Sequence, residues 1–215
     1  MIKIEGLCKA MGGRTVIDRL DLEVPDGDQT VILGPSGSGK TTLLRLIAGL
    51  EAPDKGDIFI DGIVVSSPGY ALEPSRRGLG FVFQSSALWP HMTVEQNILF
   101  GVQNLPGGKA RERVVSLLKK ASLTGLERRY PHQISGGEAR RVAIVRSLAP
   151  QPKILLMDEP LTNLNPELKT ALLQLIKECS TENHASLMYV THDKDEAGLI
   201  SGRILVMKNG RLERQ

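Results

Sequence analysis

A glycine-rich segment between an apolar run and a helical run constrains this chain more than any other feature. Residues 34–42 read Gly-Pro-Ser-Gly-Ser-Gly-Lys-Thr-Thr, which fits the pattern G-x-x-x-x-G-K-[ST]. The apolar run 30–33 predicts a buried strand, and residues 42–48 predict a helix. Backbone N–H groups of such a turn face phosphates, and the helix N-terminus adds positive charge. With Lys40 for the β- and γ-phosphates and the Thr41 hydroxyl for Mg²⁺, the sequence predicts a nucleoside triphosphate site.

Two further strand patterns end in residues that suit hydrolysis. The apolar run 153–157 leads into Asp158 and Glu159, and residues 189–191 lead into His192. The carboxyl ends of parallel strands meet at one edge of a sheet, where ligands bind. There Asp158 can hold Mg²⁺ through water, and Glu159 can act as a general base or orient the attacking water.

A second anion-binding turn precedes the first of these strands. Ile134-Ser135-Gly136-Gly137-Glu138 opens a predicted helix that runs to residue 149. A Ser-Gly-Gly turn at a helix N-terminus favours anions, because free backbone N–H groups and the helix dipole point at them. The chain therefore carries two predicted phosphate-binding surfaces.

In this order the segments resemble the ATPase subunits of ABC transporters, over essentially the whole chain. Residues 34–42 match the nucleotide-binding loop, Gln84 matches the Q-loop glutamine, and residues 134–138 match the signature written LSGGQ in the family. Asp158 is similar to the Walker B aspartate, Glu159 to the catalytic glutamate and His192 to the switch histidine that contacts the γ-phosphate.

The resemblance implies ATP and Mg²⁺ as ligands and divides the site residues by role. Catalysis is assigned to Glu159, His192 and Lys40, and Mg²⁺ binding to Thr41, Gln84 and Asp158. The residues expected to contact nucleotide are Met11, Val16, Gly34, Pro35, Ser36, Gly37, Ser38, Gly39, Lys40, Thr41, Thr42, Gln84, Ser135, Gly136, Gly137 and Glu138.

The resemblance also explains why one chain carries two phosphate surfaces. Two family domains pair head to tail, as a homodimer or a pseudo-symmetric heterodimer, and each ATP lies between the nucleotide loop of one and the signature of the other. Integral membrane permease subunits are expected to dock near residues 84–94, and a solute-binding protein completes such a system. Trp89 in that segment is either a contact anchor or a side chain packed inside the helical subdomain.

The fold class that follows is α/β, a P-loop ATPase core with a mainly parallel sheet. Strict alternation at residues 2–4, 20–24 and 57–61 predicts an N-terminal antiparallel β subdomain. Helical periodicity at 114–121 and 168–176 predicts apolar stripes on helices. We expect a single ABC ATPase domain over 1–215, with the core and β subdomain at 1–85 and 150–215 and an inserted helical subdomain at 86–149.

Composition points to a protein of the reducing cytosol. The formal charge of +3 is mild and dispersed, so no nucleic-acid partner is expected, and the pairs 76–77, 119–120, 128–129 and 140–141 are interpreted as solvated. Cys8 and Cys179 lack disulfide or zinc spacing. No signal peptide or membrane span is indicated, so the expected place is peripheral, on the inner face of the cell membrane, held by another polypeptide.

Three positions depart from the family pattern. Glu138 replaces the signature glutamine, and little effect is expected from it. Asn165 replaces the D-loop aspartate and removes a charge at the expected dimer seam. Met11 stands where the family usually places an aromatic ring on adenine, five residues before Val16, so adenine would lie against a thioether.

Two other functions stay open beside the importer ATPase. One is a soluble mechanical ATPase of the same family that acts on DNA or ribosomes, although such relatives generally join two cassettes or carry long coiled coils. The other is an exporter or lipoprotein-release subunit, which shares all the chemistry. No residue identifies the cargo.

Overall fold

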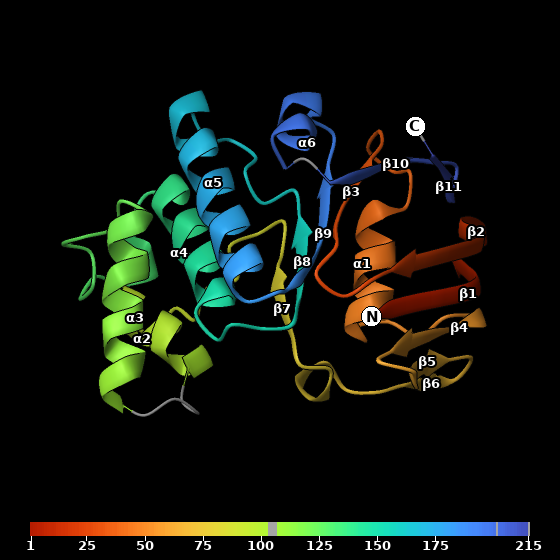
Figure 1. Ribbon diagram of the computed structural model, residues 1–215, viewed down its shortest axis with the longest axis horizontal. Helices are drawn as coiled ribbons and strands as arrows, with labels where there is room; N and C mark the ends of the chain where they lie inside the picture. The colour runs from red at the N-terminus through yellow and green to blue at the C-terminus, as the bar shows by residue number, and fades with distance from the viewer. Residues whose placement is uncertain (103–106, 201, 215) are drawn as a thin grey trace. The chain divides into compact units, whose positions relative to one another are not determined.

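The computed structural model describes residues 1–102, 107–200 and 202–214 (Figure 1). Contacts divide the chain into two compact units. The sheet unit comprises Met1–Phe81, Lys153–Glu159 and His184–Gln215, and the helical unit comprises Val82–Pro152 and Pro160–Asn183. Each unit is described by itself.

An antiparallel sheet forms the N-terminal part of the sheet unit, in the order β2-β1-β4-β5-β6. Its strands are β1 (Ile2–Met11), β2 (Arg14–Val24), β4 (Lys55–Ile60), β5 (Ile63–Ser67) and β6 (Tyr70–Ala71). Central β1 buries alternate side chains at its start, Ile2 and Ile4, because a half-buried strand turns every second residue to the core. The predicted antiparallel β subdomain is confirmed.

The second sheet is mainly parallel, in the order β11-β10-β3-β9-β8-β7. Its strands are β3 (Gln29–Leu33), β7 (Leu79–Val82), β8 (Ile154–Asp158), β9 (Ser186–Thr191), β10 (Arg203–Lys208) and β11 (Arg211–Arg214). The pairs β10–β3, β3–β9 and β9–β8 are parallel, and β10–β11 is an antiparallel hairpin. This order places the carboxyl ends of β3, β8 and β9 side by side, as the sequence predicts for a site.

Helix α1 (Lys40–Ala48) packs in the core that both sheets of this unit share. Its apolar side chains Leu43, Leu44, Leu46 and Ile47 are fully buried with residues of β1, β2, β3, β8 and β10. Burial of each such side chain contributes about 1.5–3 kcal/mol, so this packing fixes where the helix begins. The sheet unit also contains α6 (Lys194–Ile200) and the 3-10 turn η1 (Pro74–Arg76).

The helical unit contains α2 (Val94–Leu99), α3 (Gly107–Lys120), α4 (Gly136–Leu148) and α5 (Pro166–Glu182), with 3-10 turns η2 (Phe100–Val102) and η3 (Pro131–Gln133). Figure 1 shows α3, α4 and α5 beside one another, and α4 contacts both others. The predicted stripe of Val114, Leu117, Leu118 and Ala121 is buried, as expected for a core-facing side of α3.

The boundary of the helical part differs from the predicted subdomain 86–149. Helix α5 lies beyond that range, yet residues 160–183 belong to the helical unit, and α5 contacts α4. That the whole of 1–215 acts as one ATPase domain stays a proposal.

Two arginines interpreted as solvated are buried instead. Arg77 is 5% exposed, and its guanidinium donates to the carbonyls of Ile47, Val65 and Leu72 and to the hydroxyl of Ser66. It thus binds a free carbonyl near the end of α1 and ties the helix to β5. Arg140 is 4% exposed. The pairs 76–77 and 140–141 did not predict this burial, because two adjacent arginines in a sequence do not indicate which backbone carbonyls need a hydrogen-bond donor in the fold.

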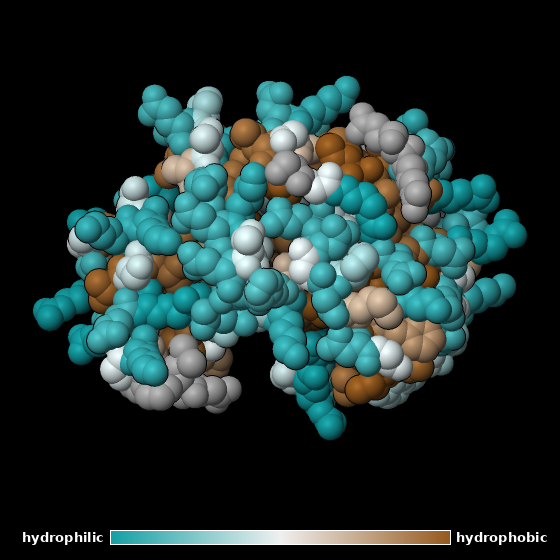
Figure 2. Space-filling view, in the orientation of Figure 1, coloured by the Kyte–Doolittle hydropathy of each residue, from teal (hydrophilic) through white to brown (hydrophobic). Residues whose placement is uncertain are grey.

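The surface agrees with the mild, dispersed charge. Figure 2 shows mostly hydrophilic side chains on the visible face of each unit. In the part of the chain that the structure describes, no helix has both the length and the apolar character that a membrane crossing requires.

Replacing Arg77 with methionine should destabilise the sheet unit. The variant leaves buried carbonyls without a donor, which costs about 3 kcal/mol. For a chain of this size that corresponds to a fall in Tm of about 6–12 °C, measured by calorimetry or circular dichroism. Arg76→Met is the matched control, since Arg76 is exposed, and its Tm should stay near the wild-type value. Equal Tm values for both variants would contradict the role given to Arg77.

Candidate active site

The nucleotide loop has a backbone that only glycine adopts easily. Gly37 and Gly39 have φ angles of 79° and 107°, in the left-handed region. Gly39 is the N-cap residue of α1, so the helix begins at Lys40 directly after the turn. The loop therefore presents a helix N-terminus, as the sequence predicts, and free N–H groups there suit an anion.

The same loop is seated closely on its neighbours. A Cβ atom on Gly34 would lie 2.5 Å from the Met207 carbonyl oxygen, and one on Gly39 would lie 2.7 Å from the Val16 carbonyl oxygen. No side chain fits at such distances. The missing Cβ atoms let the loop rest on β10 and β2, and Val16 contributes its backbone to that seat.

Lys40 lies inside the loop rather than in solvent. It is 4% exposed, and its Nζ donates to the carbonyls of Gly34 at 2.8 Å and Pro35 at 3.0 Å. Burial lowers the pKa of the ammonium, while the Glu159 and Asp158 carboxylates act in the opposite direction. A phosphate would offer this ammonium a charged partner in place of two neutral carbonyls.

Ser38 supplies an independent sign of a ligand. Its hydroxyl oxygen is buried and has no hydrogen-bond partner among the described residues. A buried unsatisfied hydroxyl costs about 1–3 kcal/mol unless a ligand or water satisfies it. Its position within residues 34–42 points to the phosphates as that partner.

Thr41 and Asp158 come together at the carboxyl end of β8. The Thr41 hydroxyl donates to Asp158 Oδ1 at 3.0 Å, and Asp158 is 2% exposed. Hydroxyl and carboxylate oxygens are the hard donors that Mg²⁺ prefers, and Mg²⁺ usually takes only one or two carboxylates beside phosphates and water. The two residues fit the ion. Among the described residues no group of three or more His, Cys, Asp or Glu side chains could hold a metal.

Glu159 stands between the lysine and the histidine. Its Oε1 lies 3.8 Å from Lys40 Nζ, and its Oε2 lies 3.2 Å from His192 Nδ1. The residue has a φ of 45°, an uncommon conformation for a side chain other than glycine, and its N–H donates to the Val190 carbonyl at 2.9 Å. Such local strain is found at functional sites, where the surroundings hold it.

A buried glutamate that sequence reasoning missed supports the histidine loop. Glu196 is 4% exposed and accepts hydrogen bonds from the Tyr189 hydroxyl at 2.9 Å and the Thr191 hydroxyl at 2.8 Å. Thr191 in turn accepts from the Asp193 N–H at 3.0 Å. These bonds fix the residues on both sides of His192. The spacing Asp-x-x-Glu at 193–196 is a helix-start signal that could have pointed to this glutamate.

In the helical unit, the signature forms the start of α4. Ser135 is the N-cap, and its hydroxyl accepts from the Glu138 N–H. The Ser135 N–H and hydroxyl donate to Glu138 Oε2 at 2.7 and 2.8 Å, and these bonds lower the pKa of the Glu138 carboxyl. The glutamate therefore completes a capping box. Gly136 and Gly137 follow at the first helical positions, where N–H groups have no helical partner.

A cavity of about 350 Å³ opens beside this signature within the helical unit. Gln84 is exposed at its edge. The lining residues are Gln84, Ser85, Ser86, Gly136, Gly137, Arg140, Thr162, Asn163 and Leu164. Asn165, which follows them, caps α5 by accepting from the Leu168 N–H at 2.9 Å. Asparagine caps the start of a helix as well as aspartate does, so the capping of α5 explains why asparagine is accepted at position 165.

Met11 is exposed near the nucleotide loop. It is 48% exposed, and the Thr42 hydroxyl lies 4.0 Å from its sulfur. The side chain thus stands at the α1 side of the loop, where a base could cover it. Adenine contact itself stays a prediction.

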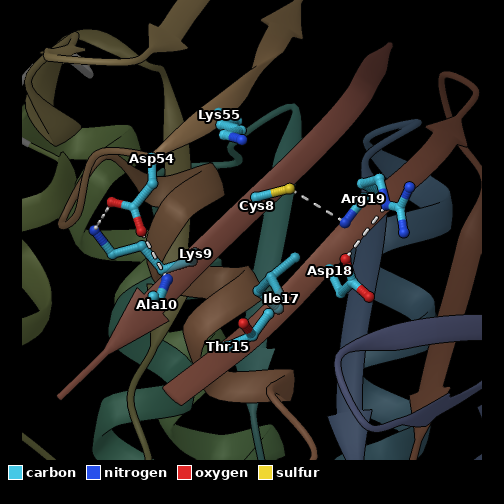
Figure 3. Close-up of a pocket in the computed structure, with 9 residues that line it drawn as sticks. All are labelled: Cys8, Lys9, Ala10, Thr15, Ile17, Asp18, Arg19, Asp54 and Lys55. Carbon is cyan, nitrogen blue, oxygen red and sulfur yellow. Dashed lines mark hydrogen bonds and ion pairs between the residues drawn. The ribbon is translucent and has the colours of Figure 1, made fainter. Parts of the chain in front are cut away.

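A larger cavity, of about 420 Å³, lies elsewhere on the sheet unit (Figure 3). Lys9 donates to Asp54 at 3.1 Å, Arg19 lies 3.5 Å from Asp18, and the Cys8 sulfur accepts from the Arg19 N–H. Its lining is Cys8, Lys9, Ala10, Thr15, Ile17, Asp18, Arg19, Asp54 and Lys55. None of these belongs to the predicted nucleotide contacts.

The structure thus groups the predicted residues by unit. The sheet unit brings the nucleotide loop together with Thr41–Asp158 and with the array of Lys40, Glu159 and His192. The helical unit holds Gln84 and the signature around one cavity.

Comparison with known proteins places this geometry in a family. The profile of the family described as ABC transporter matches residues 17–162. The sulfate/thiosulfate import ATP-binding protein CysA of a Synechocystis species is 44% identical over 99% of this chain and 59% of its own length. The Fe(3+) ions import ATP-binding protein FbpC of Photorhabdus laumondii is 44% identical over 98% and 60%.

Solved structures agree with the sequence matches. The dimeric structure of MJ0796, described as a bacterial ABC transporter cassette, has a TM-score of 0.89 at 33% identity and covers 100% of this chain and 97% of that one. A post-hydrolysis state of the same cassette with ADP and Pi has a TM-score of 0.87.

The fold is that of an ABC ATPase cassette. The chain belongs to the ABC transporter family. It spans about 60% of the length of the curated relatives it matches.

Replacing Met11 with tyrosine should tighten ATP binding. A base on an aromatic ring gains about 1–3 kcal/mol, and a thioether against a ring gains about 0.3–1.5 kcal/mol. The difference of about 1 kcal/mol corresponds to a roughly fivefold lower Kd. Titration with ATP and GTP measures it, and the wild type should discriminate weakly between them.

Ile63→Tyr is the matched control, since Ile63 is 67% exposed on β5, away from the loop, and its replacement should leave the Kd unchanged. An ATP affinity unaltered by Met11→Tyr in a folded protein would mean that Met11 does not face the base.

Proposed function

We propose that this chain binds ATP with Mg²⁺, hydrolyses it, and thereby powers the import of a solute through membrane permease subunits. The relatives named for sulfate/thiosulfate and Fe(3+) import support this direction over a soluble mechanical ATPase or an exporter. The cargo class is open between an oxyanion and a metal ion.

One observation carries the proposal: Glu159 stands within 3.2 Å of His192 and 3.8 Å of Lys40 inside a single unit. A carboxylate in this position can accept a proton from a water molecule while a cation beside it holds the phosphate that the water attacks.

The residues of the chain act as follows. Lys40 exchanges the carbonyls of Gly34 and Pro35 for phosphate oxygens, which are stronger acceptors. The N–H groups at the start of α1 and the Ser38 hydroxyl hold the remaining phosphate oxygens. Glu159 takes the proton of the attacking water, and His192 donates toward the phosphate. Glu196 keeps the histidine loop in place.

Thr41, Asp158 and Gln84 are the residues we assign to Mg²⁺. The Thr41–Asp158 pair has the donor chemistry for it, and the exposed Gln84 has an amide oxygen of the same type. When bound, the ion neutralises charge on the β- and γ-phosphates.

The signature serves the ATP of a second cassette. Ser135, Gly136 and Gly137 stand at a helix start in the helical unit, whereas the nucleotide loop belongs to the sheet unit. A head-to-tail homodimer or pseudo-symmetric heterodimer uses both surfaces. In it, each ATP binds between the nucleotide loop of one protomer and the signature of the other. The matched MJ0796 cassettes are dimeric.

The permease is expected to dock at residues 84–94, on the inner face of the cell membrane, with a solute-binding protein in the full system. Trp89 is half-buried there, its ring 4.5 Å from that of Phe100 and 4.8 Å from the Arg146 guanidinium. The side chain is therefore packed in the helical unit, as one of the two expectations has it, and its role as a contact anchor stays a prediction. Phe100, 46% exposed, extends the apolar surface.

Replacing Glu159 with glutamine should separate binding from hydrolysis. Turnover should fall by about 10²–10⁴-fold, because the amide cannot accept the proton, while the Kd for ATP stays near the wild-type value. In the presence of ATP the variant should then accumulate as a stable dimer, measured by size-exclusion chromatography with light scattering. Lys40→Ala is the contrasting variant, since it should weaken nucleotide binding itself. Near-normal turnover in Glu159→Gln would contradict the assignment of Glu159 as the general base.

Mixing two inactive variants tests the shared site. Ser135→Arg and Lys40→Ala homodimers each contain no complete composite site, so each should lack ATPase activity. Their heterodimer contains one intact site, formed by the Lys40 of one protomer and the Ser135 of the other. Phosphate release that returns only on mixing is the expected result. Full activity of Ser135→Arg alone would contradict the head-to-tail arrangement.

A further inference from the structure

Arg140 holds three segments of the helical unit together. Its Nε donates to the Pro160 carbonyl at 2.6 Å, and its Nη1 donates to the carbonyls of Phe83 at 2.5 Å and Gln84 at 2.7 Å. The side chain is 4% exposed; its bond to Pro160 is buried, and its bonds to Phe83 and Gln84 are partly buried. It lies on α4, four residues after Gly136.

Each of the bound carbonyls belongs to a segment with a place in the proposed reaction. Gln84 is assigned to Mg²⁺ and water. Pro160 directly follows Glu159, the proposed base. Helix α4 begins with the signature that faces the ATP of a second cassette. One guanidinium therefore connects the signature helix to the backbone next to two residues that act on the chain's own ATP.

The chemistry of arginine suits this task. The guanidinium is planar and always charged, and its donors point in fixed directions, so it sets the relative positions of the groups that it binds. A backbone carbonyl buried with no donor is costly, so the three segments are expected to follow the guanidinium rather than part from it. A shift of α4 would thus carry the Gln84 and Pro160 carbonyls with it.

We propose that Arg140 is a positioning residue that couples ATP at the signature to the placement of Gln84 and of Pro160, the residue after Glu159. The proposal rests on the composite-site function given above. Under this proposal, the two ATP sites of a dimer communicate through Arg140, a residue that is not among the predicted nucleotide contacts.

A purely structural role is the competing explanation, and the chain provides a control for it. Arg77 is equally buried and also binds several backbone carbonyls, but those lie at the end of α1 and in β5, away from the catalytic segments. Removal of either arginine should lower Tm. Only removal of Arg140 should change how turnover depends on ATP concentration.

The experiment compares the full-length wild type with Arg140→Met, Arg140→Lys and Arg77→Met, at a temperature where each is folded. Arg140→Met should lower kcat at least about tenfold while the Kd for ATP changes by less than about twofold. The Hill coefficient of its ATPase activity should fall from above 1 to about 1, because the two sites no longer communicate. Arg140→Lys should restore part of both, since an ammonium can still donate to these carbonyls. Arg77→Met should keep the wild-type kcat and Hill coefficient.

Two results would overturn the proposal: a kcat and Hill coefficient of Arg140→Met within about twofold of wild type, or the same losses in Arg77→Met. If Arg140→Met does not fold, the same measurements on Arg140→Lys and Arg140→Gln test the proposal. Both side chains keep hydrogen-bond donors, and lysine also keeps the charge. Failure of the wild type to hydrolyse ATP would instead contradict the proposed function, so the two failures are distinguishable.

Discussion

The Lys40 ammonium lies almost fully buried among carbonyl and carboxylate oxygens, and much of the sheet unit is arranged around it. A charge removed from water is costly unless polar groups surround it. The nucleotide loop therefore closes over the ammonium with its carbonyls, a path that needs glycine at 37 and 39. The carboxylates at the end of β8 complete the surroundings. A bound triphosphate would provide stronger compensation, so ligand binding and the order of the loop depend on the same charge.

Local patterns were read correctly because their geometry is decided within a few residues. The strand before the nucleotide loop and the helix after it follow from one continuous stretch of sequence. The burial of Arg77 and Arg140 follows instead from carbonyls 30 and 57 residues away, which no local pattern reveals. Glu196 lies nearer its partners in the sequence. A glutamate at the start of a helix is, however, just as commonly exposed to solvent, so the sequence does not indicate that Glu196 is buried. Only the folded chain shows that Tyr189 and Thr191 turn toward it.

The helical unit shows the same limit for packing. Periodicity at 168–176 predicts that α5 has an apolar side, and that prediction is confirmed by the buried Leu172, Leu175 and Ile176. It does not say which neighbour covers the stripe. In the structure α5 contacts α4, and residues 160–183 belong to the helical unit. Hydrophobic burial is non-directional, so the partner of a stripe depends on the three-dimensional path of the chain.

Glu159 and Pro160 form one of the points where the chain passes from one unit to the other. On the Glu159 side, the N–H is held by the Val190 carbonyl of the sheet unit. On the Pro160 side, the carbonyl is held by Arg140 of the helical unit. A φ in the left-handed region costs a residue with a side chain of order 1 kcal/mol, and it persists only where the surroundings determine it from both sides. The strained backbone of the proposed base thus depends on both anchors. Under the proposed coupling, a rearrangement of α4 on occupation of its signature would reach Glu159 through Pro160.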